Sequence, residues 1–149
     1  MRTAIVGMGN ILMRDDGVGV HVAQQLARLD LPGSVEVTDA GTSPDAAFAL
    51  RSIDRIIVID AARLGGSPGT VYRLSPEDTA DEELRSCHDM GLIQTLQTTR
   101  GAAAEPKILI LGVEPASVDW GLELTPEVAA SVPRVIEIVQ EELKGSQCS

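Results

Sequence analysis

Three polar residues from distant parts of the sequence, Asp16, Asp60 and His88, are of types that bind metals or transfer protons. Asp16 follows the apolar run 3–6, Asp60 directly follows the apolar run 56–59, and His88 lies at the predicted start of a helix. The carboxyl ends of parallel strands share one edge of a sheet, where ligands bind. We therefore expect the two carboxylates and the imidazole to meet there. Such oxygen and nitrogen donors suit a divalent transition metal with positions left open for substrate.

The surroundings of His88 favour its neutral form. Residues 86–89 (Ser-Cys-His-Asp) match a capping box, which predicts a helix that begins at Ser86. His88 would then lie near the positive end of the helix dipole, where protonation is disfavoured. A neutral imidazole is the form that binds a metal.

Each of these residues also has an ordinary structural explanation. Asp15 and Asp16 could both cap the first helix, and Asp60 could cap the segment after it. His88 could hydrogen-bond the end of its own helix. Because there are two adjacent acids, we assign Asp15 to a cap or to solvent and keep Asp16 for the site. The shared position of Asp16, Asp60 and His88 at one sheet edge favours the metal site.

Hydrophobic periodicity predicts the elements that must position these residues. Strands are expected at residues 3–6, 34–38, 55–59, 70–74 and 107–113, and helices at 17–29, 44–52, from 86 onward and at 125–145. Strands that alternate with helices indicate a three-layer α/β/α fold, with a doubly wound, mostly parallel sheet of about five strands. We expect one domain over residues 1–145 and a short flexible tail at 146–149.

Three details of this arrangement are also predicted. The strand at 70–74 is expected at an edge and antiparallel, because the connection before it is too short for a crossover helix. Pro133 is expected to kink or restart the last helix. Gly145 is expected to end it.

Composition excludes several classes of function. The chain has 149 residues, 44% hydrophobic but only 2% aromatic, which suits a buried parallel sheet built from Val, Ile, Leu and Ala. Its net charge of −10 argues against nucleic acid or an anionic membrane as partner. No apolar run is long enough to span a membrane, and no signal-peptide pattern is present. Two cysteines, Cys87 and Cys148, make no disulfide framework, so we expect a cytoplasmic protein with reduced thiols.

Nucleotide binding is the alternative suggested by the glycine-rich loop after the first strand. Gly7-x-Gly9 has the start of a dinucleotide fingerprint, and Asp39 ends the second predicted strand as a ribose-binding acid would. However, Leu12 replaces the third glycine, and two acids at the helix start would repel a pyrophosphate. Cys87 is not assigned as a nucleophile, because its neighbour His88 would point in a different direction along the helix.

The combined motifs resemble those of the nickel–iron hydrogenase maturation endopeptidases. The resemblance covers nearly the whole chain and is carried by residues 7–12, 15–19, 39–42, 60 with 65–70, 86–88 and 112–115. It implies a single-domain α/β/α protease that removes a C-terminal peptide from the hydrogenase large-subunit precursor. In this family cleavage follows nickel insertion, and the enzyme recognises nickel bound in the substrate. We expect that other divalent metals, such as cadmium or zinc, can occupy the same site in vitro.

The resemblance also assigns roles to residues. The metal-contacting positions of the family match Asp16, Asp60 and His88, and Asp16 stands where some relatives have a longer Glu. The same resemblance implies that the groove for the substrate tail is lined by Asn10, Asp39, Gly41 and Thr42. The family has no serine or cysteine nucleophile. A competing hypothesis is a non-enzymatic nickel-binding chaperone that uses the same three ligands.

Overall fold

The computed structural model describes residues 2–41, 53–75 and 107–147. The elements are the strands β1 (Thr3–Met8), β2 (Val35–Gly41), β3 (Arg55–Ala61), β4 (Val71–Leu74) and β5 (Lys107–Val113), the 3₁₀-helix η1 (Arg14–Gly17), and the helices α1 (Val18–Leu26) and α4 (Pro126–Gln147). All five predicted strands are present. The helices predicted at 44–52 and from 86 onward, and both cysteines, lie outside the described residues.

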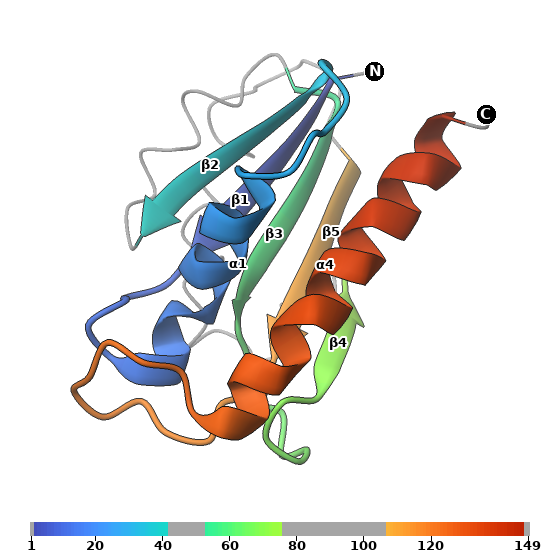
Figure 1. Ribbon diagram of the computed structural model, residues 1–149. Helices are drawn as coiled ribbons and strands as arrows, with labels where there is room; N and C mark the ends of the chain where they lie inside the picture. The colour runs from blue at the N-terminus through green and yellow to red at the C-terminus, as the bar shows by residue number, and fades with distance from the viewer. Residues whose placement is uncertain (1, 42–52, 76–106, 148–149) are drawn as a thin grey trace, which may run out of the picture.

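The strands form one five-stranded sheet in the order β2-β1-β3-β5-β4 (Figure 1). β1, β2, β3 and β5 are parallel, and β4 pairs with β5 in the antiparallel sense at the edge. The prediction of an antiparallel edge strand is therefore confirmed. The apolar run of β3 occupies the central position, where strands covered on both faces read as continuous hydrophobic segments.

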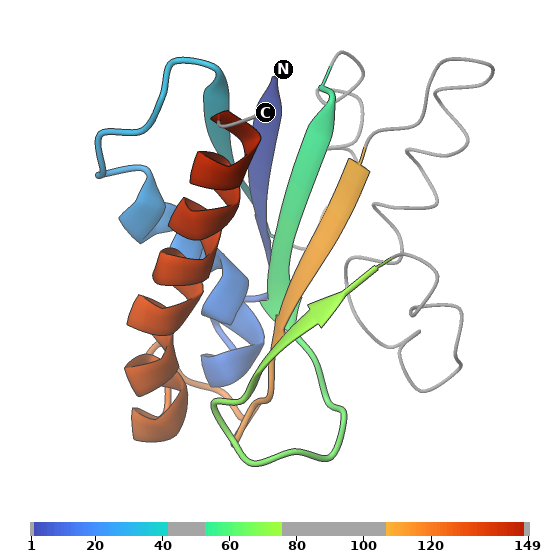
Figure 2. The same cartoon turned by 90° about the vertical axis from the view of Figure 1, so that its right-hand side faces the viewer.

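Helices α1 and α4 lie together on one face of the sheet (Figure 2). Their apolar stripes pack on alternate residues of the strands, such as Ile5, Ile57 and Leu111, all fully buried. The side chains that point to the other face, among them Val6, Val58 and Ile110, are buried as well. Both faces of the central strands are thus shielded from water, as the predicted doubly wound fold requires. No helix in the described ranges has the length and apolarity needed to cross a membrane.

The ends of two helices differ from the prediction. α1 ends at Leu26, and Leu29 is exposed instead of continuing the apolar stripe. α4 continues through Pro133 and Gly145 to Gln147. Residues 146 and 147, predicted to belong to a flexible tail, are therefore the last residues of the helix. Gly145 lacks the positive φ of a helix-ending glycine, and an interior glycine costs a helix only about 1 kcal/mol.

Candidate active site

The carboxyl edge of the sheet brings the loop after β1 against the end of β3. Gly7 of β1 is in register with Ile59 of β3, and Asp60 follows Ile59. The first turn of α1 packs directly on this strand: a Cβ on Gly19 would lie 1.9 Å from the Ile59 carbonyl oxygen. Asp16, in the turn before Gly19, therefore lies at the same edge as Asp60, as predicted.

Glycines allow the loop after β1 to fold this tightly. A Cβ on Gly9, whose φ is +125°, would lie 1.9 Å from the Asp16 carbonyl oxygen, and one on Gly17 would lie 2.6 Å from the Ile11 Cα. Similarly, a Cβ on Gly7 would lie 2.3 Å from the Gly19 carbonyl oxygen. Backbone fills the space that side chains would need. The glycines thus set the position of Asp16.

The two predicted carboxylates are held by backbone N–H groups. Asp16 is partly buried, and its Oδ2 accepts a hydrogen bond from the Asn10 N–H at 3.0 Å. Asp60 is only 1% exposed, and its Oδ1 accepts from the Ala61 N–H at 2.8 Å. β3 extends one residue beyond Asp60, so this carboxylate belongs to the strand itself and does not follow it. His88, the third predicted ligand, lies outside the described residues.

A cavity of about 380 Å³ is lined in part by Asn10, whose N–H donates to Asp16. Its lining includes three of the four residues predicted for the substrate groove: Asn10, Asp39 and Gly41; the fourth, Thr42, lies outside the described residues. The Gly9 N–H donates to the Gly41 carbonyl oxygen at 2.7 Å, which joins the loop after β1 to the end of β2 at the cavity. The structure therefore brings these residues together, and their contact with substrate stays a prediction.

Asp15 contradicts the prediction that it caps the helix or faces solvent. It is fully buried, and its carboxylate accepts hydrogen bonds from a loop about one hundred residues away. Its Oδ2 accepts from the Ala116 and Ser117 N–H groups at 2.9 and 3.0 Å. The Thr125 N–H and hydroxyl donate to Oδ1 and Oδ2 at 2.8 and 2.7 Å. Asp15 therefore fixes the loop between β5 and α4, a long-range role that the local sequence does not reveal.

These hydrogen bonds keep Asp15 ionised despite its burial. Burial raises the pKa of the Asp15 carboxyl, but the bonds from Thr125, Ser117 and Ala116 outweigh it. Its pKa consequently lies below the ordinary value of 3.8. The charge remains through the neutral range and stabilises the loop.

Glu114 has the same role in a second loop. It is buried, and its Oε1 accepts from the Leu64 and Gly66 N–H groups at 2.8 and 3.0 Å. The Tyr72 hydroxyl donates to the same oxygen at 2.9 Å. Burial and this bond raise the pKa of Tyr72, so the phenol stays protonated and remains a donor. Glu114 thus shapes the loop that follows β3 and Asp60.

The donor set at this edge is incomplete within the part of the chain that the structure describes. No three His, Cys, Asp or Glu side chains come together there as a metal-binding group. Asp16 and Asp60 supply oxygen donors of the expected type, and the predicted nitrogen donor is His88. The three-ligand site stays a prediction.

An open, mostly parallel sheet with carboxylates at its carboxyl edge is the architecture of α/β proteins that act on ligands beyond their strand ends. The chain belongs to the hydrogenase maturation protease family, whose model matches residues 20–142. It is 34% identical to the hydrogenase 2 maturation protease of Escherichia coli K12 over 152 aligned positions, covering 98% of this chain and 93% of the relative. The predicted family and its peptidase class are confirmed.

Solved structures agree with this assignment. The hydrogenase maturating endopeptidase HybD from E. coli matches with a TM-score of 0.84 and 31% identity, over 98% of this chain and 94% of that one. The nickel–iron hydrogenase maturation protease HybD from Thermococcus kodakarensis matches with a TM-score of 0.80 and 30% identity, over 96% and 99% of the two chains. The α/β fold predicted from the sequence is the fold of these enzymes.

Proposed function

We propose that this chain removes the C-terminal peptide from the large-subunit precursor of a nickel–iron hydrogenase after nickel has been inserted. The observation that carries the proposal is the position of Asp16 and Asp60 at one sheet edge, with Asp16 hydrogen-bonded to Asn10 of the adjoining cavity. An extended peptide in this cavity would lie beside Asn10, whose N–H donates to Asp16. Family membership supplies the class of reaction.

The nickel belongs to the substrate in this proposal. Carboxylate oxygens of Asp16 and Asp60, with an imidazole nitrogen of His88, form a donor set suited to a borderline divalent ion such as nickel, or cadmium or zinc in its place. A metal so placed would polarise the scissile carbonyl and activate water. One carboxylate acting as general base is the alternative route to the same hydrolysis.

The loop contacts explain how the chain would hold these groups in place. The Asn10 N–H holds Oδ2 of Asp16, and the Ala61 N–H orients Asp60. Asn10 also turns its own loop, because its Oδ1 accepts from the Leu12 N–H at 2.9 Å. The site is therefore supported by backbone geometry before substrate arrives, which lowers the cost of binding.

Cleavage of nickel-loaded and nickel-free precursor, followed by mass spectrometry, tests the proposal. We expect the loaded precursor to lose its C-terminal peptide and the nickel-free precursor to stay intact. Asp16→Asn and His88→Ala should abolish cleavage with unchanged unfolding midpoints. Asp30→Asn, which alters an exposed acid remote from this edge, is the matched control and should cleave normally.

Two outcomes would contradict the proposal. Cleavage at the wild-type rate by Asp16→Asn or His88→Ala would exclude the site. An intact loaded precursor that remains bound to the protein with its metal would favour the non-enzymatic nickel-binding chaperone.

A further inference from the structure

Large apolar side chains are exposed beside the candidate site. Of the five that the described residues expose, four lie in two loops at the carboxyl edge: Ile11, Leu12, Trp120 and Leu122. We refer to these four as the apolar edge patch. Trp120, the single tryptophan of the chain, is 76% exposed, and Leu122 is 65% exposed. Such clustering of exposed apolar groups marks an interaction surface.

The two loops are joined by backbone hydrogen bonds. The Gly121 N–H donates to the Leu12 carbonyl oxygen at 2.9 Å, and the Arg14 N–H donates to the Gly121 carbonyl oxygen at the same distance. Met13 and Gly121 form a parallel β-bridge. In Figure 1 the loop after β1 and the loop before α4 accordingly run side by side below the sheet.

The patch is also held rigidly. Asp15 fixes both ends of the loop that carries Trp120, through Ala116 and Ser117 on one side and Thr125 on the other. Arg14 adopts a positive φ of 44°, a strained conformation that persists only where the surrounding structure imposes it. An exposed aromatic side chain on a fixed backbone loses little entropy on binding, which is the property of an interface anchor.

The patch is continuous with the cavity at the site. Ile11 and Leu12 are members of the patch and also line the cavity beside Asn10. Exposed charged residues of both signs, Arg14, Asp119 and Glu123, border it in sequence. An apolar centre with a polar rim is the composition of a protein-binding surface.

We propose that the apolar edge patch binds apolar side chains of the precursor polypeptide, next to the segment that enters the cavity. This inference rests on the proposed function, because continuity with the substrate cavity identifies the occupant. Trp120 and Leu122 are then residues that determine substrate affinity, and they take no part in bond cleavage.

Fluorine NMR tests contact directly. Incorporation of 5-fluorotryptophan gives one resonance, because Trp120 is the only tryptophan. Addition of the nickel-loaded large-subunit precursor should shift or broaden this resonance. A resonance that is unchanged at a precursor concentration that supports full cleavage would overturn the inference while leaving the protease function intact. A shifted resonance without any cleavage would support the docking surface and remove the proposed catalytic function.

Steady-state kinetics provide the second measurement. The double variant Trp120→Ala, Leu122→Ala should raise KM for the precursor about tenfold and change kcat less than about twofold, because contacts remote from the scissile bond contribute uniform binding. Leu29→Ala removes an exposed leucine, 42% exposed, outside the patch and is the control, with KM unchanged.

The same variants distinguish the substrate from a second copy of the chain. If the patch were a self-association surface, wild-type mass by light scattering would rise with concentration, and the double variant would be monomeric with an unchanged KM. That combination would overturn the inference. A raised KM with a monomeric wild type would support it.

Discussion

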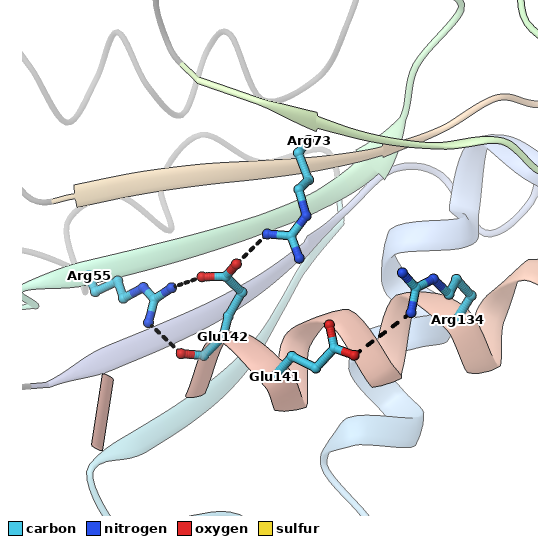
Figure 3. A network of polar contacts seen from close by, with 5 residues as sticks. All are labelled: Arg55, Arg73, Arg134, Glu141 and Glu142. Atoms are coloured by element: carbon cyan, nitrogen blue, oxygen red, sulfur yellow. Dashed lines mark hydrogen bonds and ion pairs between the residues drawn. The ribbon is translucent and has the colours of Figure 1, made fainter. Parts of the chain in front are cut away.

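At the amino edge of the sheet a carboxylate is neutralised by guanidinium groups, whereas at the carboxyl edge buried carboxylates are satisfied by backbone N–H groups. Glu142 of α4 lies between Arg55 of β3 and Arg73 of β4 and pairs with both (Figure 3). The Arg55 Nη1 also donates to the Glu142 carbonyl oxygen at 2.9 Å. These contacts attach the last turns of α4 to the sheet.

At the carboxyl edge, Asp15 and Glu114 have a role different from that of Glu142. Each accepts several hydrogen bonds from one loop, and so determines the course of that loop near Asp16 and Asp60. An ion pair joins two side chains, but a carboxylate that accepts from successive N–H groups fixes the backbone itself. The amino edge thus contributes attachment, and the carboxyl edge contributes the shape of the site.

The largest effect is expected for Asp15→Asn. The amide would direct an NH₂ group at N–H donors, leaving buried groups of the 116–125 loop unsatisfied. We expect a loss of about 3 to 4 kcal/mol in the free energy of unfolding, measured with urea. Glu142→Gln, at the partly exposed amino edge, should cost about 1 kcal/mol. Equal losses for the two variants would contradict the comparison.

Gly19→Ala should have the next largest effect. The added Cβ would overlap the Ile59 carbonyl oxygen, at 1.9 Å, and the Met8 carbonyl oxygen, at 2.5 Å, so the loop that carries Asp16 must move. We expect a loss of about 3 kcal/mol in thermal or urea unfolding. Gly145→Ala is the control, because nothing lies within 4 Å of its Cβ position, and it should stabilise α4 by about 0.5 to 1 kcal/mol.

Acid should weaken the carboxyl edge in a predictable range. Because the pKa of Asp15 is lower in the folded protein than its ordinary value of 3.8, its stabilising contribution is complete above that value. It is lost as pH falls through the lower, folded value. The difference in unfolding free energy between wild type and Asp15→Asn should therefore shrink as the pH is lowered from 7 to 3. A difference that is constant over this range would show that the charge of Asp15 does not matter.

The smallest expected effect is the coupling free energy of the ion pair between Arg55 and Glu142. The pKa of Glu142 is lowered, first by the hydrogen bond from Arg73, and then by the charges of Arg73 and Arg55, against the effect of burial. A double-mutant cycle with Arg55→Gln and Glu142→Gln should give a coupling of about 1 kcal/mol, reduced by 0.5 M salt. The side chains of this pair are 12% and 26% exposed.

A more exposed pair on α4 is the control for that cycle. The side chains of Arg134 and Glu137 are 54% and 60% exposed, and their coupling should be at most about 0.5 kcal/mol. A larger coupling for Arg134 and Glu137 than for Arg55 and Glu142 would contradict the role given to burial.

The sequence by itself determined the elements and the edge at which they meet. Continuous apolar runs identified β1, β3 and β5, and the short connection identified β4 as an antiparallel edge strand. Helical periodicity placed α1 and α4, although not their last residues. At the end of α4, side-chain patterns do not report whether Gly145 adopts a helix-ending conformation. Asp16 and Asp60 were located because the carboxyl ends of parallel strands lie at one edge, whatever the details of packing.

Only the tertiary structure decided the roles that depend on distant contacts. Asp15 is adjacent to Asp16 and equally acidic, yet it is buried because the loop around Thr125, far along the chain, supplies its hydrogen bonds. The need for glycine in the first loop becomes clear only when the backbone atoms that fill the Cβ positions are known. Likewise, Leu12 and Trp120 join in one exposed patch only because Gly121 bonds the two loops together. Sequence patterns report local periodicity, and these contacts depend on which distant segments fold against each other.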